Sequence, residues 1–125
     1  MLSNFQIYTD SKWLIFIINQ IINNSVKYKT DNPVLEINGS KTDSVIQLEI
    51  KDNGIGIRES EIGRVFQKGF TGSNGRNRRG ATGMGLYICK ELCDRLGIEI
   101  KIDSEFNEYT SVKILFPNNP NITKL

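Results

Sequence analysis

The chain of 125 residues contains no histidine, and it has only two cysteines and three prolines. Without an imidazole, it lacks the side chain best suited to act as a general base near neutral pH or to accept a phosphoryl group on nitrogen. Any chemistry on a histidine must therefore use another polypeptide segment. The same absence leaves Cys89 and Cys93, four apart on one predicted helix, without partners for a zinc site. We expect both to be reduced packing residues.

Long apolar runs and a strong net charge are also missing. The longest uncharged stretch, Trp13 to Val26, is interrupted by amides and is shorter than the roughly 20 apolar residues of a membrane span. Met1 is not followed by the pattern of a signal peptide. The net charge is only +2, which argues against a dedicated nucleic-acid or membrane surface. These features predict one soluble globular domain over residues 1–125, located in the cytoplasm.

Two glycine-rich segments are the most informative positive feature. The first, residues 52–56 (DNGIG), follows the apolar run Val45–Ile50, so a predicted strand delivers the Asp52 carboxylate into a partly buried cleft. A buried carboxylate needs a donor, and the amino group of adenine is one. Asp-Asn-Gly alone is also a common turn, but turn chemistry does not explain a second glycine cluster downstream.

The second segment, residues 80–86 (GATGMGL), opens an amphipathic helix from Gly85 to Leu96. Backbone N–H groups at a helix N-terminus bind phosphate well. The sequence has neither a complete GxGxxG fingerprint after a strand nor a GxxxxGK[ST] loop, so a nucleotide pocket here must be of another kind.

Polar side chains cluster near the end of a helix predicted from about Lys12 to Tyr28. Asn24 can supply a neutral oxygen to a magnesium ion, and Lys27 is a nearby cation. Asn24 could instead be an ordinary core amide, Lys27 a lysine that extends to solvent, and the adjacent Tyr28 an aromatic at the edge of the core. Their adjacency favours a site, and together with the glycine segments it predicts an ATP pocket.

The remaining periodicities predict an α+β fold, a two-layer α/β sandwich whose mixed, mostly antiparallel sheet carries helices on one face. Gly97 is expected to end the second long helix. Other expected elements are a short helix over Glu59–Val65, a polar turn over Gly39–Ser44, and strands over Phe5–Tyr8, Val34–Asn38, Val45–Lys51, Ile98–Asp103 and Ser111–Phe116.

Residues 66–80 are rich in glycine and cations, and we expect a long mobile loop there. Arg76, Arg78 and Arg79 either solvate this loop or reach a triphosphate when it closes. The spacing does not decide which arginine does so.

These residues, in this order, resemble the catalytic ATP-binding domain of bacterial sensor histidine kinases, in the wider family of DNA gyrase, Hsp90 and MutL with its Bergerat fold. Residues 20–28 (QIINNSVKY) look like the N box, 52–56 the first glycine box, 66–70 the F box and 80–86 the second glycine box. Residues 8–14 together with 68–72 are similar to short-sensor kinases that respond to antibiotics such as bacitracin.

By this resemblance, Asn24 would hold magnesium, Lys27 the phosphates, Tyr28 would face adenine, and Asp52 would accept its N6 hydrogen. Residues 66–82 would form an ATP lid. Gln20, Asn24 and Lys27 form the expected catalytic group. The full set expected to bind ATP is Asn24, Lys27, Tyr28, Asp52, Gly54, Gly56, Ile57, Lys68, Phe70, Arg76, Arg78, Arg79, Gly83, Met84, Gly85, Leu86 and Thr110.

Two positions depart from the family pattern. A late Gly-x-Gly-Thr appears here as residues 107–110 (NEYT), of which only Thr110 carries over. Gln20 stands one helical turn before Asn24, where the family's ATP hydrolases carry a water-activating glutamate. A glutamine cannot act as that base, so the sequence favours phosphoryl transfer over hydrolysis.

The resemblance implies an ATP-dependent protein histidine kinase module that uses Mg-ATP. It would donate the γ-phosphate to a histidine on a separate dimerisation domain, and the parent would pass it to a response regulator. The sensor, membrane and histidine-containing domains are absent from this sequence, so the fragment alone would not phosphorylate itself; the parent would be membrane-anchored. Two alternatives stay open: a gyrase-type hydrolase, and a degenerate module that binds a partner without catalysis.

Overall fold

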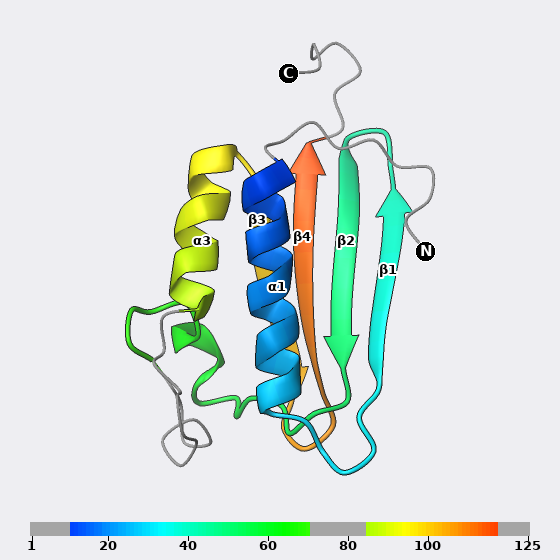
Figure 1. Ribbon diagram of the computed structural model, residues 1–125, viewed down its shortest axis with the longest axis vertical. Helices are drawn as coiled ribbons and strands as arrows, with labels where there is room; N and C mark the ends of the chain where they lie inside the picture. Colours follow the sequence, from blue (N-terminus) through cyan, green and yellow to red (C-terminus); the bar gives the residue numbers. More distant parts are fainter. Residues whose placement is uncertain (1–10, 71–84, 118–125) are drawn as a thin grey trace.

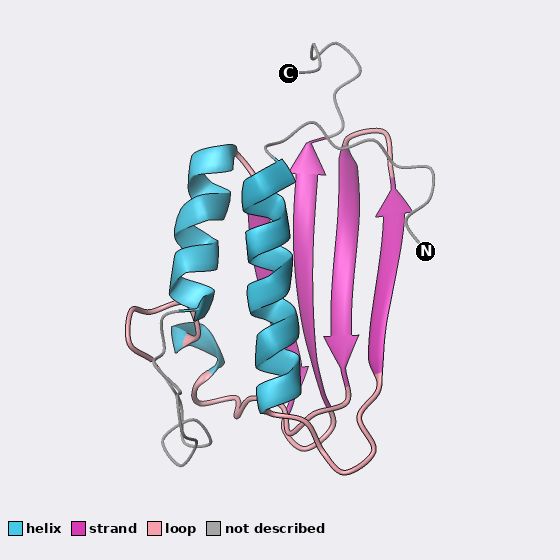
Figure 2. Cartoon of the chain, viewed as in Figure 1, coloured by secondary structure: helices cyan, strands magenta, loops and turns pink. Residues whose placement is uncertain are grey.

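A computed structural model describes residues 11–70 and 85–117, with two helices packed on one face of a four-stranded sheet (Figures 1 and 2). This confirms the expected two-layer α/β sandwich. All pairings among the described strands are antiparallel, with strand order β1-β2-β4-β3, so the parallel pairing expected of a mixed sheet is not found in this part of the chain. The elements are α1 (Ser11–Lys27), β1 (Leu35–Lys41), β2 (Val45–Asp52), a 3-10 turn η1 (Ile62–Arg64), α3 (Gly85–Leu96), β3 (Glu99–Glu105) and β4 (Tyr109–Pro117).

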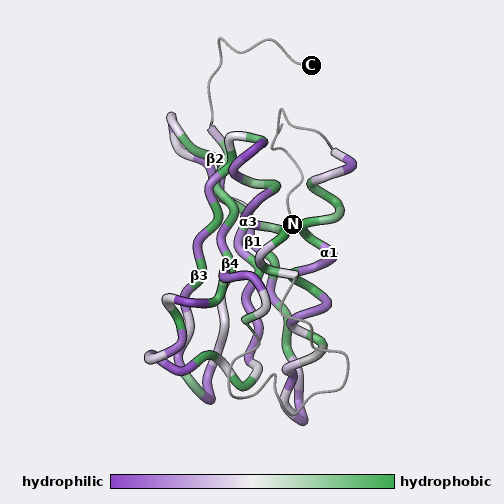
Figure 3. The backbone as a smooth tube through the Cα atoms, turned by 90° about the vertical axis from the view of Figure 1, so that its left-hand side faces the viewer, coloured by the Kyte–Doolittle hydropathy of each residue, from purple (hydrophilic) through white to green (hydrophobic). Residues whose placement is uncertain are grey.

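Strand β2 shows how the sheet acquires one apolar face. Ile46, Leu48 and Ile50 are buried toward the helices, while the residues between them are only half-buried, because side chains alternate along a strand. The same alternation of hydrophobic and hydrophilic positions is visible along the sheet in Figure 3. At the edge, β1 lies beyond the part of the sheet that the two helices cover (Figure 1), and its Leu35 and Ile37 stay 41% and 38% exposed.

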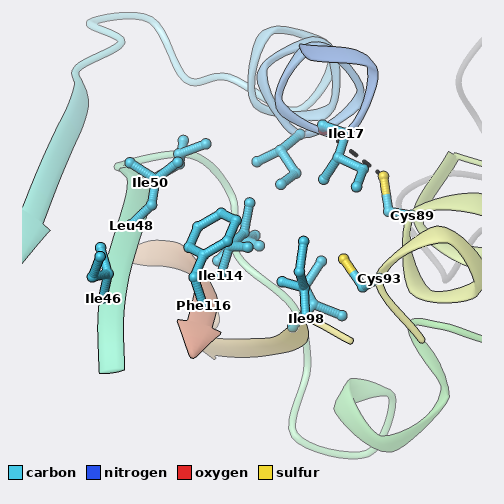
Figure 4. Close-up of a cluster of buried hydrophobic side chains, with 12 residues drawn as sticks. Ile17, Ile46, Leu48, Ile50, Cys89, Cys93, Ile98, Ile114 and Phe116 are labelled. Atoms are coloured by element: carbon cyan, nitrogen blue, oxygen red, sulfur yellow. Dashed lines mark hydrogen bonds between the residues drawn. The ribbon is translucent and has the colours of Figure 1, made fainter. Parts of the chain in front are cut away.

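The core lies between the helices and the three strands β2, β4 and β3 (Figure 4). Ile17 from α1 and Cys89 from α3 are fully buried, and the Cys89 Sγ lies 3.8 Å from the Ile17 carbonyl oxygen. Burial raises the pKa of Cys89 to about 12 and that of Cys93 to about 11. Both cysteines are free, which confirms their expected role as reduced packing residues.

The end of α3 is set by Gly97, as expected. This glycine has φ +71°, a conformation that costs glycine little and other residues more. The Ile98 amide donates to the Cys93 carbonyl at 2.8 Å and the Gly97 amide to the Asp94 carbonyl at 3.4 Å, the pattern of a Schellman motif. The chain thus leaves the helix directly into β3.

Two local predictions were wrong. The helix expected over Glu59–Val65 is only a series of turns around η1: the Arg64 amide donates to the Glu61 carbonyl at 2.9 Å, a bond three residues back rather than four. A segment this short that contains Gly63 gains too little from helical bonds to offset nucleation.

The polar turn expected over Gly39–Ser44 is also shorter, because β1 continues to Lys41. Thr42 closes the hairpin: its amide donates to the Val45 carbonyl at 2.8 Å, and its hydroxyl accepts from the Val45 amide at 3.1 Å. The strand expected over Phe5–Tyr8 lies outside the described residues. Within the described ranges, neither helix has the length and hydropathy needed to cross a membrane.

Candidate functional site

Asp52 is the last residue of β2, and its half-buried carboxylate is held by two donors. The Ser25 hydroxyl, from α1, donates to Oδ2 at 2.8 Å, and the Gly54 amide donates to Oδ1 at 2.8 Å. In the sheet Asp52 lies opposite Thr110 of β4. Each carboxylate oxygen therefore has one protein donor and capacity for another, so the group is placed to accept a hydrogen bond from a ligand.

The loop after Asp52 runs so close to its neighbours that side chains do not fit. A Cβ on Gly54 would lie 2.6 Å from the Tyr28 carbonyl oxygen, and one on Gly56 (φ +71°) would lie 2.4 Å from the Glu105 carbonyl oxygen. The Ile55 amide also donates to the Tyr28 carbonyl at 3.1 Å. Close approach of backbones thus explains these two glycines.

The β3–β4 turn holds this loop from the other side. The Asn107 amide donates to the Ile55 carbonyl at 2.7 Å, and the Ile57 amide donates to Ser104 Oγ at 2.8 Å. Ser104 in turn donates to the Tyr109 carbonyl at 2.6 Å and lies 3.2 Å from Thr110 Oγ1.

Asn107 explains how this turn forms without the glycines of the family's Gly-x-Gly-Thr pattern. Its φ is +68°, a left-handed conformation that asparagine adopts more readily than most residues. Tyr109 directs its side chain to the helix-free face of the sheet, where its hydroxyl donates to Asp103 Oδ2 at 3.0 Å; this bond raises the pKa of Tyr109. Asn107 therefore supplies the backbone conformation of a glycine, and the bulk of Tyr109 stays away from Asp52.

Asn53, next to Asp52, has a structural role that the sequence reasoning missed. Its side-chain oxygen accepts from the Val34 amide at 2.7 Å, its side-chain nitrogen donates to the Asn32 carbonyl at 2.9 Å, and its carbonyl accepts from the Thr30 hydroxyl at 3.3 Å. One asparagine therefore ties the connection between α1 and β1 to the glycine loop. In the sequence, the only local indication of this role was the side-chain amide itself, which can both donate and accept hydrogen bonds.

Gln20, the first member of the predicted polar cluster of α1, lies beside the start of α3. Gln20 and Asn24 are half-buried one turn apart, and Gln20 Oε1 lies 3.1 Å from where a Cβ on Gly85 would be. The Tyr28 amide donates to the Asn24 carbonyl at 3.1 Å, one residue beyond the helix end. The structure thus places Gln20 beside Gly85, while the side chain of Lys27 lies outside the described residues.

The other predicted positions differ in their exposure. Lys68 is exposed, and Phe70 is half-buried with the Arg64 guanidinium 4.9 Å from its ring centre. Leu86 is half-buried in the first turn of α3 and Ile57 is half-buried after the glycine loop. The expected lid is described only for residues 66–70; outside the described residues lie Arg76, Arg78, Arg79, Gly83 and Met84.

The metal-ligating side chains of this region suit an ion only if the ion arrives bound to a substrate. Among the described residues, no group of three His, Cys, Asp or Glu side chains could hold an ion. Magnesium commonly takes one or two protein oxygens and completes its shell with substrate phosphates and water. The single amide oxygen of Asn24 is compatible with that arrangement.

Comparison with known proteins gives a consistent result. A family model described as "Histidine kinase-, DNA gyrase B-, and HSP90-like ATPase" matches residues 9–120. The chain is 38% identical to sensor histidine kinase GraS of Staphylococcus epidermidis over 117 residues, which cover 94% of this chain and 34% of that protein. It is 45% identical to sensor histidine kinase YxdK of Bacillus subtilis over 114 residues, 89% of this chain and 34% of that one.

Among solved structures, a mycobacterial sensor histidine kinase, MprB, superimposes with a TM-score of 0.79 at 24% identity, over 90% of this chain and 76% of that one. This similarity supports the fold. The chain spans about a third of the length of the curated relatives it matches.

Proposed function

The chain belongs to the family of histidine kinase-, DNA gyrase B- and HSP90-like ATPases, as its sequence predicted, and from this we propose that it binds Mg-ATP and presents the γ-phosphate to a histidine on a separate dimerisation domain. The observation that carries the proposal is the Asp52 carboxylate, fixed by Ser25 and Gly54 at the end of β2 with acceptor capacity to spare. The glycine loop begins directly after it, and α1, which carries the polar cluster, supplies the Ser25 donor.

Recognition of the base follows from the charge of Asp52. An ionised carboxylate only accepts hydrogen bonds, and adenine offers a 6-amino donor. Guanine presents a carbonyl oxygen at the same ring position, so two acceptors would meet without a hydrogen between them. A site built to bond a donor rejects the analogue that lacks it, which supports ATP over GTP as the ligand.

The phosphates would lie toward α3 and the polar cluster. The N-terminus of α3 offers backbone N–H groups and the positive end of the helix dipole. Asn24 would hold magnesium, Lys27 would neutralise charge, and the arginines of residues 66–82 would add cations. Phosphoryl transfer needs mainly positioning and charge neutralisation, and the neutral Gln20 supplies no base that would activate water.

The nucleophile would come from outside the chain, since no histidine is present. The matched relatives are named sensor histidine kinases and are about three times as long as the matched region. We therefore assign the chain to the catalytic domain of a membrane-anchored kinase, on the cytoplasmic side, whose phosphohistidine supplies a response regulator. The similarity of residues 8–14 and 68–72 to antibiotic-responsive kinases supports envelope or antibiotic stress as the stimulus.

Calorimetric titration of the chain with ATP and magnesium, with GTP as the control, tests the proposal. We expect magnesium-dependent binding of ATP in preference to GTP. Asp52→Asn should weaken ATP binding by at least about tenfold, the effect of losing one charge-assisted hydrogen bond. Its effect on folding should be small, because the Ser25 hydroxyl can accept from an asparagine amide instead of donating. Equal losses of binding and folding stability would contradict the assignment of Asp52.

The titration also separates the alternatives. Absence of ATP binding would favour a degenerate module. Steady-state release of inorganic phosphate by the isolated chain would favour a hydrolase. A purified histidine-containing dimerisation domain of a sensor kinase, added with ATP, should become labelled only if the chain donates phosphoryl groups.

A further inference from the structure

Ser25 was not among the residues expected to matter for ATP, yet its hydroxyl donates to the Asp52 carboxylate at 2.8 Å. We propose that Ser25 is a positioning residue that holds the Asp52 carboxylate in the orientation required by the 6-amino group of adenine, and so helps to select that base. The inference rests on the proposed function, because it concerns the same site.

The direction of the Ser25 hydrogen bond follows from its two possible acceptors. Ser25 Oγ lies 2.8 Å from Asp52 Oδ2 and 3.3 Å from the Ile21 carbonyl oxygen one helical turn back. The hydroxyl has a single hydrogen, and a bond to an ionised acceptor is shorter and about twice as strong as a neutral one. The carboxylate therefore receives the hydrogen, and the longer contact to Ile21 is secondary.

Two independent elements then fix the plane of the carboxylate. Ser25 belongs to α1 and bonds Oδ2, whereas the Gly54 amide belongs to the glycine loop and bonds Oδ1. The loop is itself held by the Ile55 amide on the Tyr28 carbonyl. With Ser25 removed, one donor remains, and the carboxylate can turn about its terminal torsion, which is soft. Part of the binding free energy of the nucleotide would then be used to fix the carboxylate orientation, which Ser25 now fixes before binding.

A purely structural role for Ser25, as a link between α1 and β2, is the competing explanation. The chain contains a matched control for it. Ser111, itself buried, donates to Glu49 Oε2 at 2.6 Å. This bond also joins a serine hydroxyl to a carboxylate of β2, but it links two strands and lies on the face away from the helices, as the burial of the alternate residues of β4 shows. Loss of that bond would affect folding without touching the nucleotide.

The test is calorimetric titration of four proteins, the natural chain and the variants Ser25→Ala, Ser25→Thr and Ser111→Ala. Each is titrated with Mg-ATP and with the magnesium triphosphate of purine riboside, which lacks the 6-amino group. For Ser25→Ala we expect affinity for ATP to fall about 3- to 10-fold, the range of one net hydrogen bond. Affinity for the analogue should change by less than about twofold on the same scale.

The other two variants complete the design. Ser25→Thr keeps the hydroxyl and should restore most of the affinity for ATP. Ser111→Ala should lower the urea midpoint of unfolding while leaving both affinities unchanged. If Ser25→Ala does not fold, Ser25→Cys replaces it, since a thiol has similar size but is a weak donor.

Two results would overturn the inference while the proposed function stands. One is that the natural chain binds ATP and the Ser25→Ala variant binds ATP with the same affinity. The other is an equal loss for ATP and for the analogue, which would make Ser25 a structural link only. A natural chain that binds no ATP would remove both the inference and the proposed function.

Discussion

Replacement of Gly56 by alanine should destabilise the protein through two separable effects, backbone conformation and close contact. Gly56 has φ +71°, and so does Gly97 at the end of α3. An added Cβ at Gly56 would lie 2.4 Å from the Glu105 carbonyl oxygen, whereas one at Gly97 would meet nothing within 4 Å. Gly97→Ala therefore measures the conformational cost alone, and Gly56→Ala measures that cost plus the overlap.

The magnitudes follow from these geometries. A left-handed conformation costs a non-glycine residue roughly 1–2 kcal/mol, partly offset by the smaller entropy of the unfolded chain, so Gly97→Ala should lose about 1 kcal/mol. At Gly56 the overlap adds the cost of overpacking, about 1–3 kcal/mol. The Glu105 oxygen cannot easily retreat, because it accepts from the Glu108 amide at 2.9 Å in the same turn. We expect a total loss of about 2–4 kcal/mol.

Urea unfolding of both variants, followed by far-ultraviolet circular dichroism, measures these losses. Calorimetry with Mg-ATP adds a functional arm, because displacement of the Gly56 loop moves the Gly54 amide that holds Asp52. Gly56→Ala should therefore also weaken ATP binding, and Gly97→Ala should not. If the two variants lose equal stability, the close contact between the loop and the β3–β4 turn does not constrain the protein, and the reasoning fails.

Three further outcomes are expected. Because burial raises the pKa of Cys89 to about 12, both core thiols should resist a disulfide reagent at pH 8 and react only as fast as the chain unfolds. Folding keeps the thiols protonated, whereas the unfolded chain ionises them near pH 9. Their contribution to the free energy of unfolding is therefore complete below that pH and declines above it. Rapid labelling of the folded protein would contradict their burial. Asn53→Ala should remove both side-chain bonds to the α1–β1 connection and cost about 1–3 kcal/mol, and hydrogen exchange should show faster opening at Val34 than at Ile50; uniform changes would argue against a local clamp. Gln20→Glu should raise phosphate release from ATP by at least about tenfold if a carboxylate there can activate water, with Gln20→Ala as the control that should not.

Local sequence patterns predicted most of the architecture. The periodicity of α1 and α3, the alternation along β2 and the glycine that ends α3 are each encoded within a few neighbouring residues. The same holds for Asp52, because a carboxylate at the end of an apolar strand and two residues before a glycine can be recognised from the sequence alone. The expected helix over Glu59–Val65 failed where its own pattern was weakest, in a short segment with a glycine.

Other features depend on contacts that no local pattern records. The bond from Ser25 to Asp52 joins residues 27 apart in the chain, and the left-handed Asn107 is fixed by a bond to Ile55 in a different loop. Sequence alone determined the two long helices and the four described strands, since propensity and periodicity act between near neighbours. The tertiary structure decided which donors hold Asp52 and why Gly54 and Gly56 have no room for side chains, because these depend on how distant backbones pack together.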